Sequence, residues 1–119
     1  MIKCGIDTIE IARLANLKQE IRTRFLKRVF TELELTQAHD QFENLSSVFA
    51  AKEAVSKALG TGIGFVSWQD IEIIHLPTGE PTVHLHGNAA LVADQKGLTE
   101  WSVSISHDRD KAIAMAVAT

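Results

Sequence analysis

The sequence has little cysteine and no long hydrophobic run. Cys4 is the only cysteine among 119 residues, which excludes an internal disulfide bond and a zinc site built from several thiolates. No apolar stretch approaches the roughly 20 residues that span a bilayer. Acidic residues interrupt the N-terminal segment MIKCGIDTIEI, where a secretory signal needs an apolar core. We therefore expect a cytoplasmic protein with no membrane partner.

The composition is typical of one globular domain. The chain has 119 residues, of which 45% are hydrophobic, and both values are ordinary for a folded domain rather than a disordered one. We expect a single domain over residues 1–119.

The charge is unevenly distributed along the chain. Residues 1–28 hold seven Lys or Arg and three Asp or Glu, a net of +4, whereas the other residues hold five basic and twelve acidic side chains, a net of -7. A basic segment on an acidic body favours docking of an acidic partner. Nucleic acid is not expected as the partner, because the pI is near 5.9 and the basic segment has only Phe25 as an aromatic residue.

Hydrophobic spacing predicts both strands and helices. In the first strand, Ile2, Cys4 and Ile6 form the apolar face, and Asp7 points to the other face near the strand end. Apolar side chains at three- and four-residue spacing over residues 11–25 predict one amphipathic helix or two short ones.

The middle of the chain carries clear helix signals. Thr31 and Glu34 predict a capping box that opens a short helix, and residues 40–45 predict a polar connection. Residues 49–59 are rich in alanine and predict a helix that ends at Gly60 in a left-handed cap.

The last third of the chain predicts two hairpins and a helix. The segments are strands at 71–74 and 82–86, a helix between Asn88 and Gly97, and strands at 101–105 and 113–117. The fold class is therefore α+β, with an antiparallel sheet and helices packed on one side of it.

Two carboxylates and one ammonium form the strongest candidate site. Glu53 and Lys57 lie one turn apart on the helix face that leads to Gly60 and Gly62. An exposed ion pair is the simpler interpretation. However, small neighbours leave room for a ligand, and Asp7 with Glu53 would form the oxygen-only, two-ligand set that suits Mg²⁺ and a substrate phosphate. Lys57 would then neutralise charge on that phosphate, and the glycine-rich loop could cradle further oxygens.

The histidines offer a second kind of site. His84 and His86 share a strand face, a spacing that some zinc enzymes use, but two strand histidines alone are a weak signal. His107 ends a serine-lined strand at the mouth of a tight turn, where it is well placed to meet a ligand.

Five segments in order resemble the holo-[acyl-carrier-protein] synthase family, the small stand-alone type of 4'-phosphopantetheinyl transferase. They cover nearly the whole chain, and the GxD start, the KEAxxKAxGTG helix and the SISH ending are specific. The segments read GIDTIEIARL, FLKRVFTELE, FAAKEAVSKALGTGI, GEPTVHL and SVSISHDRDKAIAMAVA.

The resemblance implies a reaction and its residues. Such enzymes transfer the 4'-phosphopantetheine arm of coenzyme A to a serine of apo-acyl carrier protein and release adenosine 3',5'-bisphosphate. By similarity, Asp7 and Glu53 bind Mg²⁺, Lys57 stabilises the departing bisphosphate, and either Glu53 or a metal-bound water takes the serine proton. His107 also acts in the site, and the expected coenzyme-binding residues are Lys57, Gly60, Gly62, Pro81, Ser104, Ser106 and His107.

The resemblance also implies partners. The basic first helix would grip the acidic carrier through Arg13, and also through Arg22 and Arg24. The family is typically a homotrimer with shared active sites, and the alanine-lined last strand would pack against another subunit. The carrier would serve fatty acid or polyketide biosynthesis.

One residue departs from the family pattern, and two rival functions remain. The family usually has Arg before FAAKEA, where this chain has Val48, so a phosphate contact is missing or supplied elsewhere.

A small zinc hydrolase would use His84 and His86. A non-catalytic module would keep the basic helix for carrier docking and lose turnover.

Overall fold

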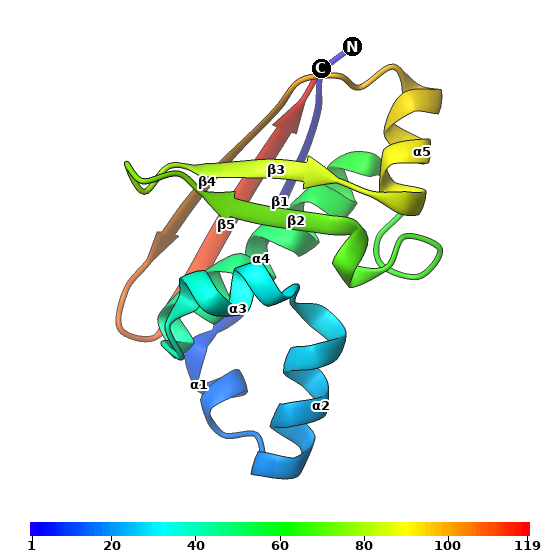
Figure 1. Cartoon of the computed structure of the whole chain (residues 1–119). Coiled ribbons are helices and arrows are strands. Elements are labelled where there is room, and N and C mark those ends of the chain that lie inside the picture. Colours follow the sequence, from blue (N-terminus) through cyan, green and yellow to red (C-terminus); the bar gives the residue numbers. More distant parts are fainter.

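The computed structural model describes all residues from 1 to 119. Five strands and six helical segments follow one another, and the two chain ends lie close together (Figure 1). In chain order they are β1 (Lys3–Glu10), α1 (Ile11–Ala15), α2 (Gln19–Val29), α3 (Glu32–Ala38), α4 (Phe42–Leu59), the 3₁₀ turn η1 (Trp68–Asp70), β2 (Ile71–His75), β3 (Pro81–Leu85), α5 (Gly87–Lys96), β4 (Trp101–His107) and β5 (Lys111–Ala118).

The strands form two antiparallel sheets. β1, β5 and β4 make a three-stranded sheet in that order, and β2 and β3 make a separate hairpin that crosses it in direction (Figure 1). The α+β class, the antiparallel pairing and both predicted hairpins are confirmed. The expected single sheet is wrong, because the β2–β3 hairpin hydrogen-bonds to none of the other three strands.

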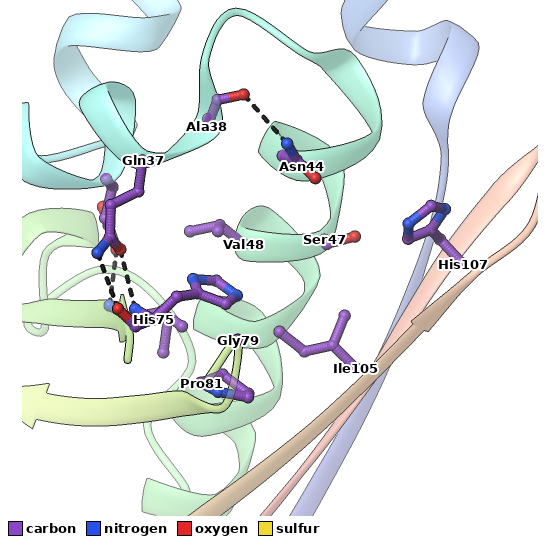
Figure 2. Close-up of a pocket in the computed structure, with 12 residues that line it drawn as sticks. Gln37, Ala38, Asn44, Ser47, Val48, His75, Gly79, Pro81, Ile105 and His107 are labelled. Carbon is purple, nitrogen blue, oxygen red and sulfur yellow. Dashed lines mark hydrogen bonds between the residues drawn. The ribbon is translucent and has the colours of Figure 1, made fainter. Parts of the chain in front are cut away.

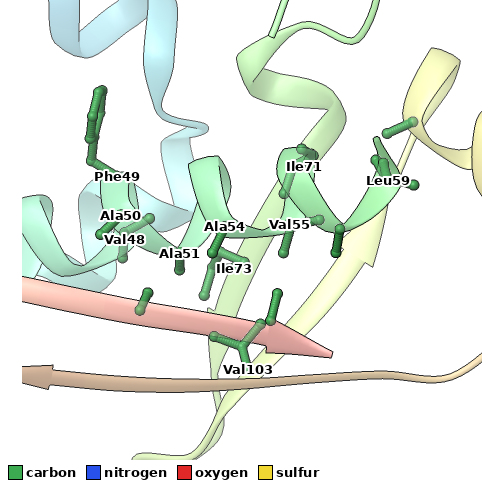
Figure 3. Packing of buried hydrophobic residues seen from close by; sticks show 14 of the residues in the cluster. Val48, Phe49, Ala50, Ala51, Ala54, Val55, Leu59, Ile71, Ile73 and Val103 are labelled. Atoms are coloured by element: carbon green, nitrogen blue, oxygen red, sulfur yellow. The ribbon is translucent and has the colours of Figure 1, made fainter. Parts of the chain in front are cut away.

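Helix α4 is the centre of the core. Its 18 residues cover one face of the three-stranded sheet, and its other side packs against β2 (Figure 3). Neither α4 nor any other helix is long and apolar enough to cross a bilayer. Alanines line the contact on both sides, which lets helix and sheet approach closely. They include Ala51, Ala54 and Ala58 of α4, and Ala112, Ala114, Ala116 and Ala118 of β5.

The buried face of β1 is the opposite of the predicted one. Ile2 and Ile6 are 73% and 55% exposed, whereas Gly5 and Ile9 are buried against α4. Asp7 lies on the α4 side, in the middle of β1 rather than near its end. The alanines of β5 likewise pack on α4 of the same chain, not on another subunit. The physical reason is that only very small side chains fit under α4.

Most helix predictions are confirmed. Residues 11–29 form two helices, and α3 begins with the predicted capping box of Thr31 and Glu34. Gly60 caps α4 with φ of 83°.

Two boundary predictions are wrong. The expected connection over residues 40–45 already contains the first turn of α4, which begins at Phe42. Asn88 is not the N-cap of α5, since it lies inside that helix and donates a hydrogen bond to the carbonyl oxygen of Phe65 at 2.8 Å.

Candidate active site

The fold brings Asp7 and Lys57 into contact beside Glu53. Lys57 Nζ lies 3.2 Å from Asp7 Oδ1 and donates a hydrogen bond to the carbonyl oxygen of Ile6 at 2.9 Å. The predicted ion pair between Glu53 and Lys57 is absent, and the ammonium joins the helix to β1 instead. The side chains are accessible, with Lys57 50% and Asp7 19% exposed.

Both burial and neighbouring charges shift the pKa of Glu53. Partial burial raises the pKa of Glu53 above its ordinary value, and the negative charge of Asp7 raises that pKa further. The positive charges of Lys57 and Arg13 act in the opposite direction. Two carboxylates whose charges repel each other across a partly exposed space provide a favourable place for a cation.

Gly5 is the reason that these groups can meet. A Cβ atom at position 5 would lie 2.0 Å from the carbonyl oxygen of Ala54 and 2.8 Å from the nitrogen of Ala58. No side chain fits there, so the α4 backbone lies directly on β1. Asp7, two residues further on the same face, is thereby held beside the α4 face that carries Glu53 and Lys57.

The glycine-rich loop starts where α4 ends. The N–H groups of Thr61 and Gly62 both donate to the carbonyl oxygen of Ser56 at 3.2 Å. The N–H group of Gly60 donates to the carbonyl oxygen of Lys57 at 3.0 Å. These amides therefore cap the helix and do not point freely toward a ligand. A Cβ at Gly62 would meet no atom within 4 Å, so the loop leaves open space.

A cavity of about 370 Å³ lies between α3, α4, the β2–β3 hairpin and β4 (Figure 2). Pro81 and His107, both predicted to bind the coenzyme, line it together with Val48. No Lys or Arg lines this cavity, so Val48 leaves its wall without a fixed positive charge. Its other polar lining residues are Glu34, Gln37, Asn44, Ser47 and His75.

Ser104 and Ser106 lie on the other face of the sheet. In the pairing of β4 with β5, they lie opposite Met115 and Ile113, which are exposed. His107 lies opposite the buried Ala112. Side chains directly opposite in an antiparallel pair share a face. Within one chain, the two serines therefore do not face the cavity.

The three arginines predicted for docking differ in their contacts. The Arg22 guanidinium donates to the carbonyl oxygens of Ala15 and Leu17 at 2.8 and 2.9 Å and lies 5.0 Å from the centre of the Phe42 ring. It holds the α1–α2 connection. Arg13 and Arg24 are exposed and form no ion pair.

His84 and His86 do not belong to a cluster of side chains that could bind zinc. His84 bonds to Thr82 Oγ1 at 2.9 Å, and His86 bonds to Glu72 Oε1 at 3.0 Å. No three His, Cys, Asp or Glu side chains group closely enough to hold a metal ion. A cation at Asp7 and Glu53 would therefore have only two protein ligands and would complete its shell with water and substrate, as Mg²⁺ does.

A buried ion pair that was not predicted from the sequence joins Lys52 to Glu34, one of the residues that line the cavity. Lys52 Nζ lies 2.6 Å from Glu34 Oε1, and both side chains are fully buried. Burial lowers the pKa of Lys52, and the negative charge of Glu34 opposes that shift. The signal was present, because Lys52 follows Val48 by four residues and precedes Val55 by three, on the core stripe of α4.

Known proteins and a family model match this chain along nearly its whole length. The sequence model of the 4'-phosphopantetheinyl transferase superfamily matches residues 3–117. The holo-[acyl-carrier-protein] synthase of Natranaerobius thermophilus is 43% identical over 120 residues, which cover 98% of this chain and 96% of the relative. That of Caldanaerobacter subterraneus subsp. tengcongensis is 45% identical over 117 residues, which cover 96% and 91%.

Solved structures agree with the sequence relatives. The holo-[acyl-carrier-protein] synthase of Helicobacter pylori, solved in complex with coenzyme A, has a TM-score of 0.88 at 36% identity and full coverage of both chains. The enzyme of Neisseria meningitidis has a TM-score of 0.89 at 34% identity, with 100% of this chain and 99% of that chain covered. This chain therefore belongs to the 4'-phosphopantetheinyl transferase superfamily.

Proposed function

We propose that this chain, acting as one transferase domain, moves the 4'-phosphopantetheine group of coenzyme A to a serine of apo-acyl carrier protein. Adenosine 3',5'-bisphosphate is the other product. Relatives that are holo-[acyl-carrier-protein] synthases support this function, as does a similar structure that binds coenzyme A. The observation that carries it is the contact of Asp7 with Lys57 beside the partly buried Glu53.

Asp7 and Glu53 are the residues that would hold Mg²⁺. Their donors are all oxygen, and burial together with the negative charge of Asp7 raises the pKa of Glu53, so a hard cation between them is favourable. When bound, the ion would neutralise charge on the coenzyme diphosphate. The serine proton would go either to Glu53 or to a metal-bound water. Lys57, which is half exposed, would bind the departing phosphate.

The nucleotide end of coenzyme A would occupy the cavity lined by Pro81 and His107. Neither Asp7 nor Glu53 lines that cavity, so in the proposed trimer the two parts of the site would come from neighbouring chains. Gly62 would let the diphosphate approach the loop after α4, because a Cβ there would meet no atom within 4 Å, whereas Lys96 Nζ lies in the corresponding space at Gly60. His107 would orient a phosphate by donating a hydrogen bond.

The carrier would dock on the basic N-terminal segment. Arg13 is exposed near Glu53, close enough to influence its pKa, and Arg24 is exposed on α2. Acyl carrier proteins are acidic, so these charges would speed association, and salt would weaken it. Arg22 would contribute indirectly, by holding the α1–α2 connection.

The assembly we propose is a homotrimer in the cytoplasm, serving fatty acid or polyketide biosynthesis. Its support is the outer face of the three-stranded sheet, where Ile2, Ile6, Ile113 and Met115 are all more than 40% exposed. Contact between copies through this face would also bring Ser104 and Ser106 to a site on a neighbouring chain.

Intact-mass spectrometry of the carrier tests this function. Apo-acyl carrier protein incubated with this protein, coenzyme A and Mg²⁺ should gain the mass of one phosphopantetheine group, and the gain should disappear when coenzyme A or Mg²⁺ is left out. A carrier that binds this protein but gains no mass would instead support the alternative function, a non-catalytic module that only docks the carrier. The reason to consider that alternative is Val48 in the cavity wall, where the family usually has Arg.

A further inference from the structure

Lys96 reaches from the end of one helix to the end of another. It is the last residue of α5, and its Nζ donates a hydrogen bond to the carbonyl oxygen of Leu59, the last residue of α4. A Cβ at Gly60 would lie 2.9 Å from this Nζ. The ammonium group therefore lies directly against the C-terminal cap of α4.

This end of α4 is electrostatically unfavourable for an anion. The C-terminus of a helix carries a partial negative charge from its free carbonyl groups. Glu53, Lys57 and Gly60 follow helical spacing along one face of α4, so the candidate active site continues toward that end. The site itself contains two carboxylates, and its one ammonium, on Lys57, is already bonded to Asp7.

We propose that Lys96 is a binding residue for the coenzyme diphosphate, acting through the positive charge that it places at the α4 C-terminus. This inference rests on the function proposed above. The charge of Lys96 offsets the negative end of α4 and makes the adjacent space near Gly60 more favourable for phosphate oxygens. It acts on the charged substrate and takes no part in proton transfer, so its effect appears in coenzyme binding rather than in turnover.

Charge and hydrogen bonding at Lys96 can be separated by substitution. Lys96→Met removes both, Lys96→Gln keeps a hydrogen-bond donor without charge, and Lys96→Arg keeps the charge. Gln95→Ala is the matched control, because Gln95 is the exposed preceding residue of α5 and makes no side-chain hydrogen bond.

The experiment is titration calorimetry with coenzyme A and with adenosine 3',5'-bisphosphate, at low and high salt, beside steady-state transfer kinetics. Lys96→Met and Lys96→Gln should weaken binding of both ligands about three- to ten-fold at low salt. That loss should shrink at high salt, and KM for coenzyme A should rise while kcat changes little. Lys96→Arg and Gln95→Ala should bind as the native protein does.

The inference would be overturned if Lys96→Gln, folded as judged by its thermal unfolding, bound coenzyme A as tightly as the native protein. It would also be overturned if Lys96→Arg lost as much affinity as Lys96→Met, because packing rather than charge would then be responsible. If Lys96→Met fails to fold, Lys96→Gln carries the test. Failure of the proposed function looks different, since the native protein would then neither bind coenzyme A nor modify the carrier.

Discussion

Glu53 is a carboxyl group that folding places in an unfavourable environment for its charge. Burial and the nearby Asp7 raise its pKa above 4.5 in the folded protein. A raised pKa means that the contribution of Glu53 to stability is fully present below pH 4.5 and is lost as the pH rises through the folded-state value. At neutral pH the ionised side chain therefore works against folding, which is common for groups that serve a reaction.

Glu53→Gln should consequently be at least as stable as the native protein at pH 7. The amide is neutral at every pH, so the two unfolding temperatures should converge at about pH 4 and separate in favour of Gln as the pH rises. Thermal unfolding followed by circular dichroism from pH 4 to pH 8 measures the difference. A lower unfolding temperature for Glu53→Gln at pH 7 would contradict this account of Glu53.

Sequence patterns indicated the candidate site residues but not their contacts. Helical spacing put Glu53 and Lys57 on one face, and Asp7 was singled out by its small neighbours. The pairing of Lys57 with Asp7 was not predictable, because it depends on how closely α4 lies to β1. Lys52 was missed because charged residues are almost always on the surface, and only its position on the apolar stripe of α4 indicated burial.

At the scale of elements, the contact between α4 and β1 depends on Gly5. Gly5→Ala would place a methyl group 2.0 Å from the carbonyl oxygen of Ala54, and a rigid helix backbone cannot move aside cheaply. We expect a loss of at least about 3 kcal/mol in the free energy of unfolding. Urea denaturation measures it.

Gly64→Ala is the matched control for Gly5→Ala. A Cβ at Gly64 would meet no atom within 4 Å, and its φ is not positive, so the substitution should be neutral or slightly stabilising. Equal stability of the Gly5 and Gly64 variants would show that α4 does not lie on β1 as described.

The buried pair of Glu34 and Lys52 joins α3, α4 and β2. Besides Lys52 Nζ, the Glu34 carboxylate accepts the N–H groups of Thr31 at 2.9 Å and Ile73 at 2.8 Å. Either Lys52→Met or Glu34→Gln should cost about 3–5 kcal/mol, since a single change leaves a polar or charged partner unmatched in the core.

The double variant distinguishes this pairing from two separate losses. Lys52→Met combined with Glu34→Gln removes both charges and keeps an acceptor for only one of the two N–H groups, since Thr31 and Ile73 donate to different oxygens of Glu34. It should cost less than the sum of the single changes, by about 1–3 kcal/mol in a double-mutant cycle of unfolding free energies. Additive costs would mean that the two charges do not interact.

The strand positions were predictable, but the side of β1 that is buried was not. Alternation located β1 and β5 because their side chains change character at every second residue. Hydrophobicity favoured Ile2 and Ile6 as the buried face, yet the close approach of α4 selects Gly5 and the β5 alanines instead. Side-chain size outweighed side-chain hydrophobicity at this contact.

At the scale of the whole molecule, the outer sheet face is the clearest sign of assembly. Met115 is 46% exposed on this face and should be covered by another copy in the proposed trimer. Met115→Glu would bury a charge at that contact, so sedimentation velocity at micromolar concentration should show monomers where the native protein forms trimers. Transfer activity should fall with assembly, because in the proposed trimer Ser104 and Ser106 would contribute to a site on the neighbouring chain.

Ile21→Glu is the control for assembly, since Ile21 is equally exposed, at 46%, but lies on α2. It should leave the oligomeric state unchanged. A native protein that sediments as a monomer would contradict the proposed assembly.

The α+β class followed from the order of periodic segments, whereas the division into two sheets did not. Local patterns define each hairpin, but nothing local determines whether β2 and β3 join strands that lie far away in the sequence. The same limit applies to the candidate site, where Asp7 of β1 contacts Lys57 of α4.

The most direct test of the central claim is the initial rate of carrier modification by variants that are fully folded at the assay temperature. With coenzyme A and Mg²⁺, Asp7→Asn and Glu53→Gln should each be slower than the native protein by about 100-fold or more, while His84→Ala keeps nearly the native rate. Native rates for both carboxylate variants, or a larger loss for His84→Ala, would contradict the assignment of the active site to Asp7 and Glu53.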